Sequence, residues 1–179
     1  KEFATWATKK DSPIVAWLRE LAKRAHEERS GPGVGAIGMC LTGGFALAMA
    51  VDEVLAAPVL SQPSTPFTLS PWHARDPGVS AEDLAVVRRR CEEEGLCVLG
   101  LRFSLDAMAP HARFRRLREE LGDAFLAVEI DSSPGNPHGI PPWHHSVLAH
   151  HYVDRPDHPT RQAEDRVVAF FRERLTAGR

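Results

Sequence analysis

Cysteine is scarce in this sequence, and it has no long apolar run. The 179 residues include 3 cysteines, a small and odd number that gives no disulfide framework and favours a reducing compartment. Asp52 and Glu53 interrupt the most apolar stretch, 43–60, so no segment reaches the roughly 18 apolar residues of a membrane span. No signal-peptide pattern opens the chain. These absences predict a cytoplasmic protein that has no membrane partner.

An excess of charge of one sign is missing as well. The chain carries 22 Lys and Arg against 24 Asp and Glu, so its formal charge is −2. This balance disfavours nucleic acid as a partner and favours a small molecule. The arginine run at 113–118 is followed by Glu119 and Glu120, which predicts a solvated helix face. The oligomeric state, including a homo-oligomer, stays open.

Apolar periodicity predicts alternating helices and strands. Helices are expected over 13–29, 41–51, 80–94, 110–121 and 162–175, and strands over 34–39, 54–60, 96–101 and 124–130. Ser80 opens a capping box, and Gly95 ends the helix that follows. Short apolar strands that alternate with helices predict an α/β fold, with a mostly parallel sheet and helices on both faces. An apolar content of 43% is enough to bury a core, so residues 1–179 are expected to form a single domain.

The stretch GMCLTGG, residues 38–44, places Cys40 between an apolar strand and a helix. A nucleophile on such a turn adopts a strained backbone and needs small neighbours two positions away. Gly38 meets that need fully, and Thr42 meets it less well. The helix N-terminus would favour the thiolate, and the Leu41 N–H is the natural first donor to an oxyanion. We therefore predict a nucleophile at Cys40, whereas Cys91 and Cys97 lack such surroundings.

A cysteine nucleophile needs a base and an acid that orients the base. Asp106 is the acid in the loop after the third strand, and Asp131, at the end of the fourth strand, is the alternative. His144 and His145 both follow the fourth strand, so either is a candidate base. The chain order nucleophile, acid, histidine is that of the alpha/beta-hydrolase arrangement.

Together, GMCLTGG, LDAMAP and HHSVLA resemble the dienelactone hydrolase family, whose members are cysteine-dependent and have the alpha/beta-hydrolase fold. The family's motifs are Gly-x-Cys-x-Gly-Gly, an Asp-x-x-x-Pro loop and a His followed by Ser. The resemblance implies that Cys40 is the nucleophile, Asp106 the acid and His145, rather than His144, the base. It also implies hydrolysis of an ester, lactone or thioester with no cofactor and no metal.

The sequence departs from the family pattern in three ways. Thr42 stands where the family usually has glycine, and Ala149 stands where dienelactone-cleaving members place an arginine. Dienelactone itself is therefore not the expected substrate. The family also has strands before the nucleophile strand, including a loop that gives the second oxyanion N–H. The resemblance thus implies that this chain is the C-terminal part of the fold and lacks its N-terminal third, and the start at Lys1 is compatible with a longer protein.

The histidine-rich segment suggests a metal site as a further possibility. If 144–151 were helical, His144 and His151 would stand ~10 Å apart along the axis, too far for zinc bonds of ~2 Å. We therefore expect no metal site and assign these histidines to solvated or hydrogen-bonded loop positions. Trp72, His73 and Trp143 are expected in loops, at a pocket mouth or in packing.

Two function classes remain after these observations. The first is a hydrolase that uses Cys40, His145 and Asp106. The second is a non-catalytic alpha/beta-hydrolase-like module that binds a small molecule or a partner in the same pocket. The three residue types in the right chain order favour the enzyme, and the absent front third favours the binding module.

Overall fold

The computed structural model describes residues 12–65 and 70–176 as an α/β fold. Four parallel strands lie in the order β1-β2-β3-β4: β1 (Val34–Met39), β2 (Leu55–Ser61), β3 (Val98–Phe103) and β4 (Phe125–Ile130). Because all four strands run in the same direction, their carboxyl ends meet at one edge of the sheet. A crossover that contains a helix joins each strand to the next. The predicted α/β class, with a parallel sheet, is therefore confirmed.

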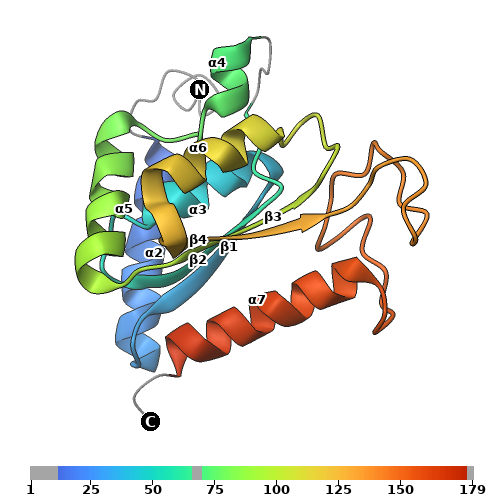
Figure 1. Cartoon of the computed structure of the whole chain (residues 1–179). Helices are drawn as coiled ribbons and strands as arrows, with labels where there is room; N and C mark the ends of the chain where they lie inside the picture. The colour runs from blue at the N-terminus through green and yellow to red at the C-terminus, as the bar shows by residue number, and fades with distance from the viewer. Residues whose placement is uncertain (1–11, 66–69, 177–179) are drawn as a thin grey trace.

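Helices cover both faces of this sheet (Figure 1). One face carries α2 (Pro13–Arg29), α3 (Gly43–Met49), α5 (Ala81–Glu94) and α6 (His111–Leu121), and the other carries α7 (Pro159–Leu175). The core is correspondingly divided in two. Leu47, Val87 and Phe114 pack in the first cluster, and Val147, Val167 and Phe170 pack in the second. The second cluster thus includes the loop after β4, which fixes that loop against the sheet.

Most predicted elements are present, with shifted ends. The predicted helix at 41–51 shortens to α3 because a 3-10 turn, Cys40–Thr42, precedes it. The last helix begins at Pro159 rather than at 162, since His158 caps it by accepting from the Thr160 N–H and proline suits a first helical turn. A short helix, α4 (Pro71–Arg75), replaces part of the predicted loop. Elsewhere the N-cap half of the predicted capping box is confirmed, because Ser80 Oγ accepts from the Asp83 N–H at 3.0 Å.

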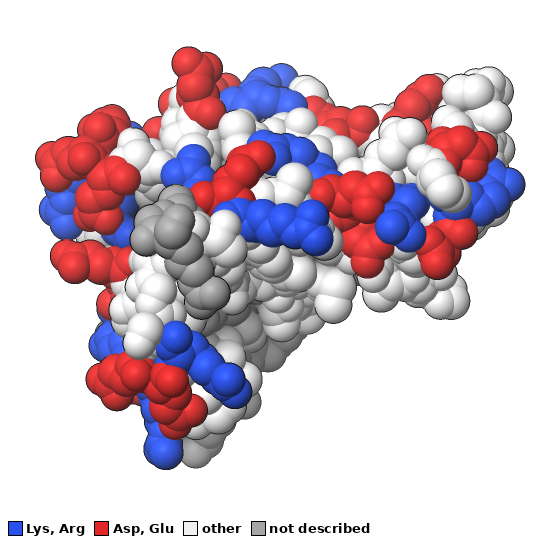
Figure 2. Space-filling model, turned by 90° about the horizontal axis from the view of Figure 1, so that it is seen from below, with Lys and Arg blue, Asp and Glu red and all other residues white. Residues whose placement is uncertain are grey.

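The face that carries α7 has charges of both signs. Figure 2 shows this face, on which Lys and Arg side chains are interspersed with Asp and Glu side chains. Along α7, Arg161 pairs with Asp165 at 3.1 Å and Arg166 with Glu173 at 3.3 Å. Such exposed pairs contribute little stability, on the order of 0 to 1 kcal/mol each. None of the helices within 12–65 and 70–176 combines the length and apolarity needed to cross a bilayer.

The sheet ends on β1, which pairs only with β2 among the described residues. Ile37 and Met39 of this strand are 44% and 42% exposed. Among the described residues, β1 is therefore an exposed edge of the sheet.

The prediction of a solvated arginine face is wrong for Arg113. Its side chain is 0% exposed, although Arg115 and Arg116 of the same helix are in contact with solvent. The guanidinium donates to four backbone carbonyls and one hydroxyl from three segments of the chain: Pro63 O, Thr65 Oγ1, His73 O, Asp76 O and Met108 O. Burial lowers the pKa of Arg113 to about 10, yet the group stays charged at neutral pH. Arg113 therefore ties the loop after β2 to the loop that carries Asp106.

Replacing Arg113 with Met is expected to destabilise the fold by about 3 to 5 kcal/mol, because several buried acceptors lose their donor at once. The measurement is urea unfolding followed by circular dichroism. Arg115→Met on the same helix is the matched control, since Arg115 is exposed and pairs with Glu119 at a distance of 4.0 Å. That control is expected to change stability by no more than about 0.5 kcal/mol. Equal effects of the two variants would contradict the structural role of Arg113.

Candidate active site

Cys40 lies at the carboxyl end of β1, on the turn into α3. Its φ of 54° is in the left-handed region, which costs a non-glycine residue about 1 to 2 kcal/mol. The turn is tight, because a Cβ at Gly38 would stand 2.1 Å from the Thr42 carbonyl oxygen. Glycine at 38 is therefore required, as the sequence predicted.

Thr42 stabilises the same turn through its hydroxyl. Oγ1 accepts from the Met39 N–H at 2.9 Å and donates to the Met39 carbonyl at 2.8 Å. These two bonds satisfy both backbone groups of the residue before Cys40. A threonine is thus compatible with the sharp turn at a position where the sequence pattern favoured glycine.

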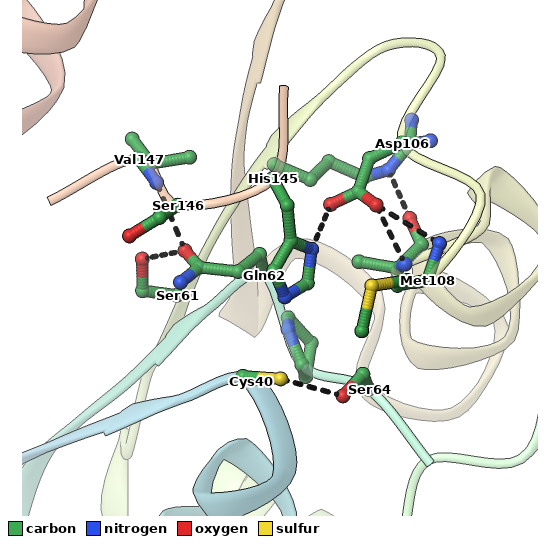
Figure 3. Close-up of polar contacts among 12 residues, drawn as sticks. Cys40, Ser61, Gln62, Ser64, Asp106, Met108, His145, Ser146 and Val147 are labelled. Atoms are coloured by element: carbon green, nitrogen blue, oxygen red, sulfur yellow. Dashed lines mark hydrogen bonds and ion pairs between the residues drawn. The ribbon is translucent and has the colours of Figure 1, made fainter. Parts of the chain in front are cut away.

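The structure brings His145 and Asp106 together from different loops. His145 Nδ1 lies 2.7 Å from Asp106 Oδ2, and Figure 3 shows the ring between Asp106 and the pair Cys40 and Ser64. A carboxylate accepts only, so Nδ1 carries the proton and Nε2 has the free lone pair. Nε2 is buried and has no hydrogen-bond partner among the described residues. The imidazole is therefore oriented and has an unused acceptor.

The Cys40 thiol is paired with Ser64 rather than with Nε2. Sγ lies 3.0 Å from Ser64 Oγ, and the Ser64 N–H also donates to the Cys40 carbonyl at 3.0 Å. Ser64 follows β2, so it reaches Cys40 from the neighbouring strand. Ser64 was not predicted as a site residue from the sequence. The signal that points to Ser64 is its place at the carboxyl end of the neighbouring strand.

The pKa values of the two groups move in opposite directions. Burial raises the pKa of the Cys40 thiol, but the Ser64 hydrogen bond, the His145 ring and the Leu41 N–H together bring it below its ordinary value. Burial lowers the pKa of His145, but Asp106 and the Cys40 sulfur raise it above its ordinary value. Both shifts favour a thiolate beside an imidazolium. Cys40 and His145 are thus coupled, since each shifts the pKa of the other toward its charged form.

Asp106 is held by its own loop and by a buried arginine. The carboxylate is 3% exposed, and Oδ1 accepts from the Met108 and Ala109 N–H groups at 2.9 and 3.2 Å. Arg102 of β3 donates to the Ala109 carbonyl at 2.7 Å and to the Ser104 carbonyl at 2.9 Å, which lie on either side of Asp106. The loop therefore presents Oδ2 to His145 in one fixed orientation.

The alternative acid and base lie elsewhere. Asp131 accepts from the Ser133 N–H at 2.8 Å, and no hydrogen bond among the described residues joins it to a histidine. His144 stacks on His151, with the ring centroids 4.0 Å apart, and burial lowers its pKa. Of the candidates named from the sequence, Asp106 and His145 are the pair that the structure joins.

The histidine segment 144–151 is not helical, although the sequence-based distance between His144 and His151 assumed a helix. Residues 144–151 form turns and not a helix, so His144 and His151 lie side by side, and the expected ~10 Å separation along a helix is wrong. No group of three or more His, Cys, Asp or Glu side chains within 12–65 and 70–176 is arranged to hold a metal ion.

Trp72 and His73 border a hollow that Cys40, Asp106 and His145 do not line. Trp72 and His73 are on α4 and line a hollow of about 250 Å³ with Arg116, and Trp143 is 77% exposed. A second hollow of about 230 Å³ lies between α5 and α6, beside Leu84. Cys40, Asp106 and His145 line neither hollow.

The remaining cysteines have different surroundings from Cys40. Burial raises the pKa of Cys91 to about 11, and Cys97 Sγ accepts from Arg174 at 2.5 Å. Among the described residues, no histidine is hydrogen-bonded to either sulfur. Comparisons with protein-family models, curated proteins and solved structures found no match for the chain.

Proposed function

We propose that this chain is a cysteine hydrolase, similar to the dienelactone hydrolase family, that cleaves an ester, lactone or thioester. The observation that carries the proposal is the 2.7 Å bond from His145 Nδ1 to Asp106 Oδ2, which leaves the unpartnered Nε2 beside Cys40. A nucleophile on a strained turn, a base and an acid that orients the base form the constellation that acyl transfer requires.

The proposed reaction starts with transfer of the thiol proton from Cys40 Sγ to His145 Nε2. For this transfer, Sγ exchanges its contact with Ser64 for one with Nε2. The thiolate then attacks the substrate carbonyl carbon, and the Leu41 N–H donates to the oxyanion that forms. Asp106 stabilises the imidazolium through Nδ1.

Collapse of the tetrahedral intermediate breaks the bond to the leaving group. The leaving alcohol or thiol takes the proton from His145 Nε2, and a thioester to Cys40 remains. Water then gives a proton to Nε2 and attacks this thioester. The second collapse releases the carboxylic acid and returns the proton to the Cys40 sulfur.

The rate of iodoacetamide labelling against pH tests the nucleophile directly. In the C91S/C97S variant, Cys40 is the single thiol of the chain. Because only the thiolate reacts, a lowered pKa moves the rise in labelling to a pH below the ~8.5 of an ordinary cysteine. Adding His145→Ala is expected to move that rise back to higher pH. A labelling curve that is ordinary and insensitive to His145→Ala contradicts the proposal.

The contact of Sγ with Ser64 favours a second candidate, a non-catalytic module that binds a small molecule or a partner. In that case the thiol is a resting hydrogen-bond partner and not a nucleophile. The same experiment separates the two functions. A binding module is expected to show ordinary or absent labelling at Cys40, with no acyl group transferred from p-nitrophenyl acetate.

A further inference from the structure

Side chains accept hydrogen bonds from three successive backbone N–H groups of the loop that carries His145. His151 Nδ1 accepts from the N–H groups of His145 and Ser146 at 3.1 and 3.0 Å. Gln62 Oε1, from the end of β2, accepts from the Val147 N–H at 3.2 Å. The loop has turn geometry and no ladder of its own, so these acceptors fix the backbone on which His145 stands.

The two acceptors differ in their response to protons. An amide oxygen such as that of Gln62 does not titrate between pH 4 and 9. A histidine Nδ1 accepts only while it has no proton, so His151 must be neutral with its proton on Nε2. A second proton would place an Nδ1–H against two N–H donors and would break both hydrogen bonds.

We propose that His151 is a positioning residue whose neutral imidazole holds the loop of His145 in place, and that its protonation releases this loop. For catalysis, this inference rests on the proposed function, because the loop carries the proposed base. The hydrogen-bond switch itself depends only on the loop geometry. His151 does not touch the reacting atoms and acts through the backbone of residues 145 and 146.

The surroundings of His151 favour the neutral form. The His144 ring stacks on it at 4.0 Å with an interplanar angle of 13°, and the His150 ring meets it edge-on at 4.8 Å. Phe103 of β3 contributes an apolar edge at 6.4 Å. Burial lowers the pKa of His151, the charges of His150 and His145 lower it further, and Asp106 alone opposes them.

The sign of the pH effect follows from this direction. A histidine with a lowered pKa in the folded state is neutral above that pKa and gains its proton only as the pH falls below about 6.5. Because the unfolded chain binds this proton more readily, acid reduces the stability of the folded loop. Below neutral pH, the hydrogen bonds from the N–H groups of residues 145 and 146 to His151 are therefore expected to weaken. The hydrogen bond from the Val147 N–H to Gln62 is expected to persist.

The test follows the backbone amide signals of residues 145, 146 and 147 by ¹H–¹⁵N NMR from pH 8 to pH 5. In the wild-type protein, the signals of His145 and Ser146 are expected to shift with one common midpoint below about 6.5. The signal of Val147 is expected to lack this step. In His151→Asn, Oδ1 occupies the place of Nδ1 and cannot be protonated, so the step is expected to disappear. A step with a midpoint below about 6.5 that persists in His151→Asn, or is absent from the wild type, overturns the proposal; the ring of His145, whose pKa is raised, titrates at higher pH.

Hydrolysis of p-nitrophenyl acetate gives a second readout. His151→Leu removes the acceptor, and kcat is expected to fall roughly 10- to 100-fold because the base is misplaced. His151→Asn is expected to restore most of that loss and to weaken the acid sensitivity of kcat. His150→Asn is the matched control, since its ring is not a partner of either amide.

The outcomes separate this inference from the proposed function. Absent hydrolysis and ordinary Cys40 labelling in the wild type contradict the proposed function, and the amide titration still decides the role of His151. Full activity in His151→Leu, with normal labelling of Cys40, contradicts the positioning role alone. If His151→Leu does not fold, the titration of His151→Asn decides on its own.

Discussion

Replacing Cys40 with Ala is expected to lower kcat for hydrolysis of p-nitrophenyl acetate by about 10⁴- to 10⁶-fold. The loss is large because the sulfur is the atom that bonds to the acyl carbon, and no other described thiol has the same contacts. Alanine retains the Cβ that is already present, so it fits the strained turn at φ 54° as cysteine does. The fold is therefore expected to stay intact, which circular dichroism checks.

Mass spectrometry of the intact protein provides a readout that does not depend on turnover. Mixing the wild type with p-nitrophenyl acetate is expected to add one acetyl group, and peptide mapping is expected to place it on Cys40. Cys91→Ala is the matched control, because that sulfur has a pKa raised to about 11. Loss of acetylation in the control, or its persistence in Cys40→Ala, contradicts the assignment of the nucleophile.

Local sequence signals were sufficient for the strands and for the sharp turn at Cys40. The four strands are short apolar runs bounded by glycine or charge, and the change of period after Met39 located the start of a helix. Gly38 was recognisable because the constraint on it is local: its missing Cβ makes room for the Thr42 carbonyl, four residues away. Such short-range effects are encoded within one turn of the chain.

Contacts between distant segments were less predictable. Arg113 has the sequence surroundings of a solvated helix residue, and its burial depends on the loops at 63–65 and 73–76 closing over it. The stacking of His144 on His151 likewise depends on turns whose geometry no apolar period reports. Ser64 and Gln62 were missed for the same reason. Their partners, Cys40 and Val147, lie in segments that follow β1 and β4.

The proposed site is therefore a set of loops that buried side chains hold at one edge of the sheet. Arg102 fixes the loop of Asp106 from within β3, and Arg113 bonds to the same loop from α6. The loop of His145 is fixed by Gln62, which comes earlier in the chain at the end of β2, and by His151, which comes later in the same loop. Each of these contacts is a backbone group bonded to a side chain, so the positions of His145 and Asp106 depend on residues that do not react. This explains why Cys40, Asp106 and His145 could be named from the sequence, whereas the residues that position them could not.

Asp106→Asn is expected to lower kcat by about 10³- to 10⁴-fold while leaving the fold intact. Asparagine retains an oxygen that can accept from the Met108 and Ala109 N–H groups, as Oδ1 of Asp106 does. Its amide nitrogen then faces His145 Nδ1, where it donates and does not accept. The imidazole is forced to place its proton on Nε2, so the atom beside Cys40 loses the lone pair that takes the thiol proton.

Asp131→Asn is the matched control, because Asp131 is exposed and its hydrogen-bond partners are Ser133 and Ser104 rather than a histidine. It is expected to leave kcat within about twofold of the wild type, as for a surface change that breaks no buried contact. The change of tautomer in His145 can be tested separately from activity. The labelling of Cys40 in Asp106→Asn is expected to rise at higher pH than in the wild type, since a neutral ring with Nε2 protonated no longer favours the proton leaving the thiol. If Asp131→Asn lost activity and Asp106→Asn kept it, the acid would be Asp131, and the 2.7 Å bond to His145 would have only a structural role.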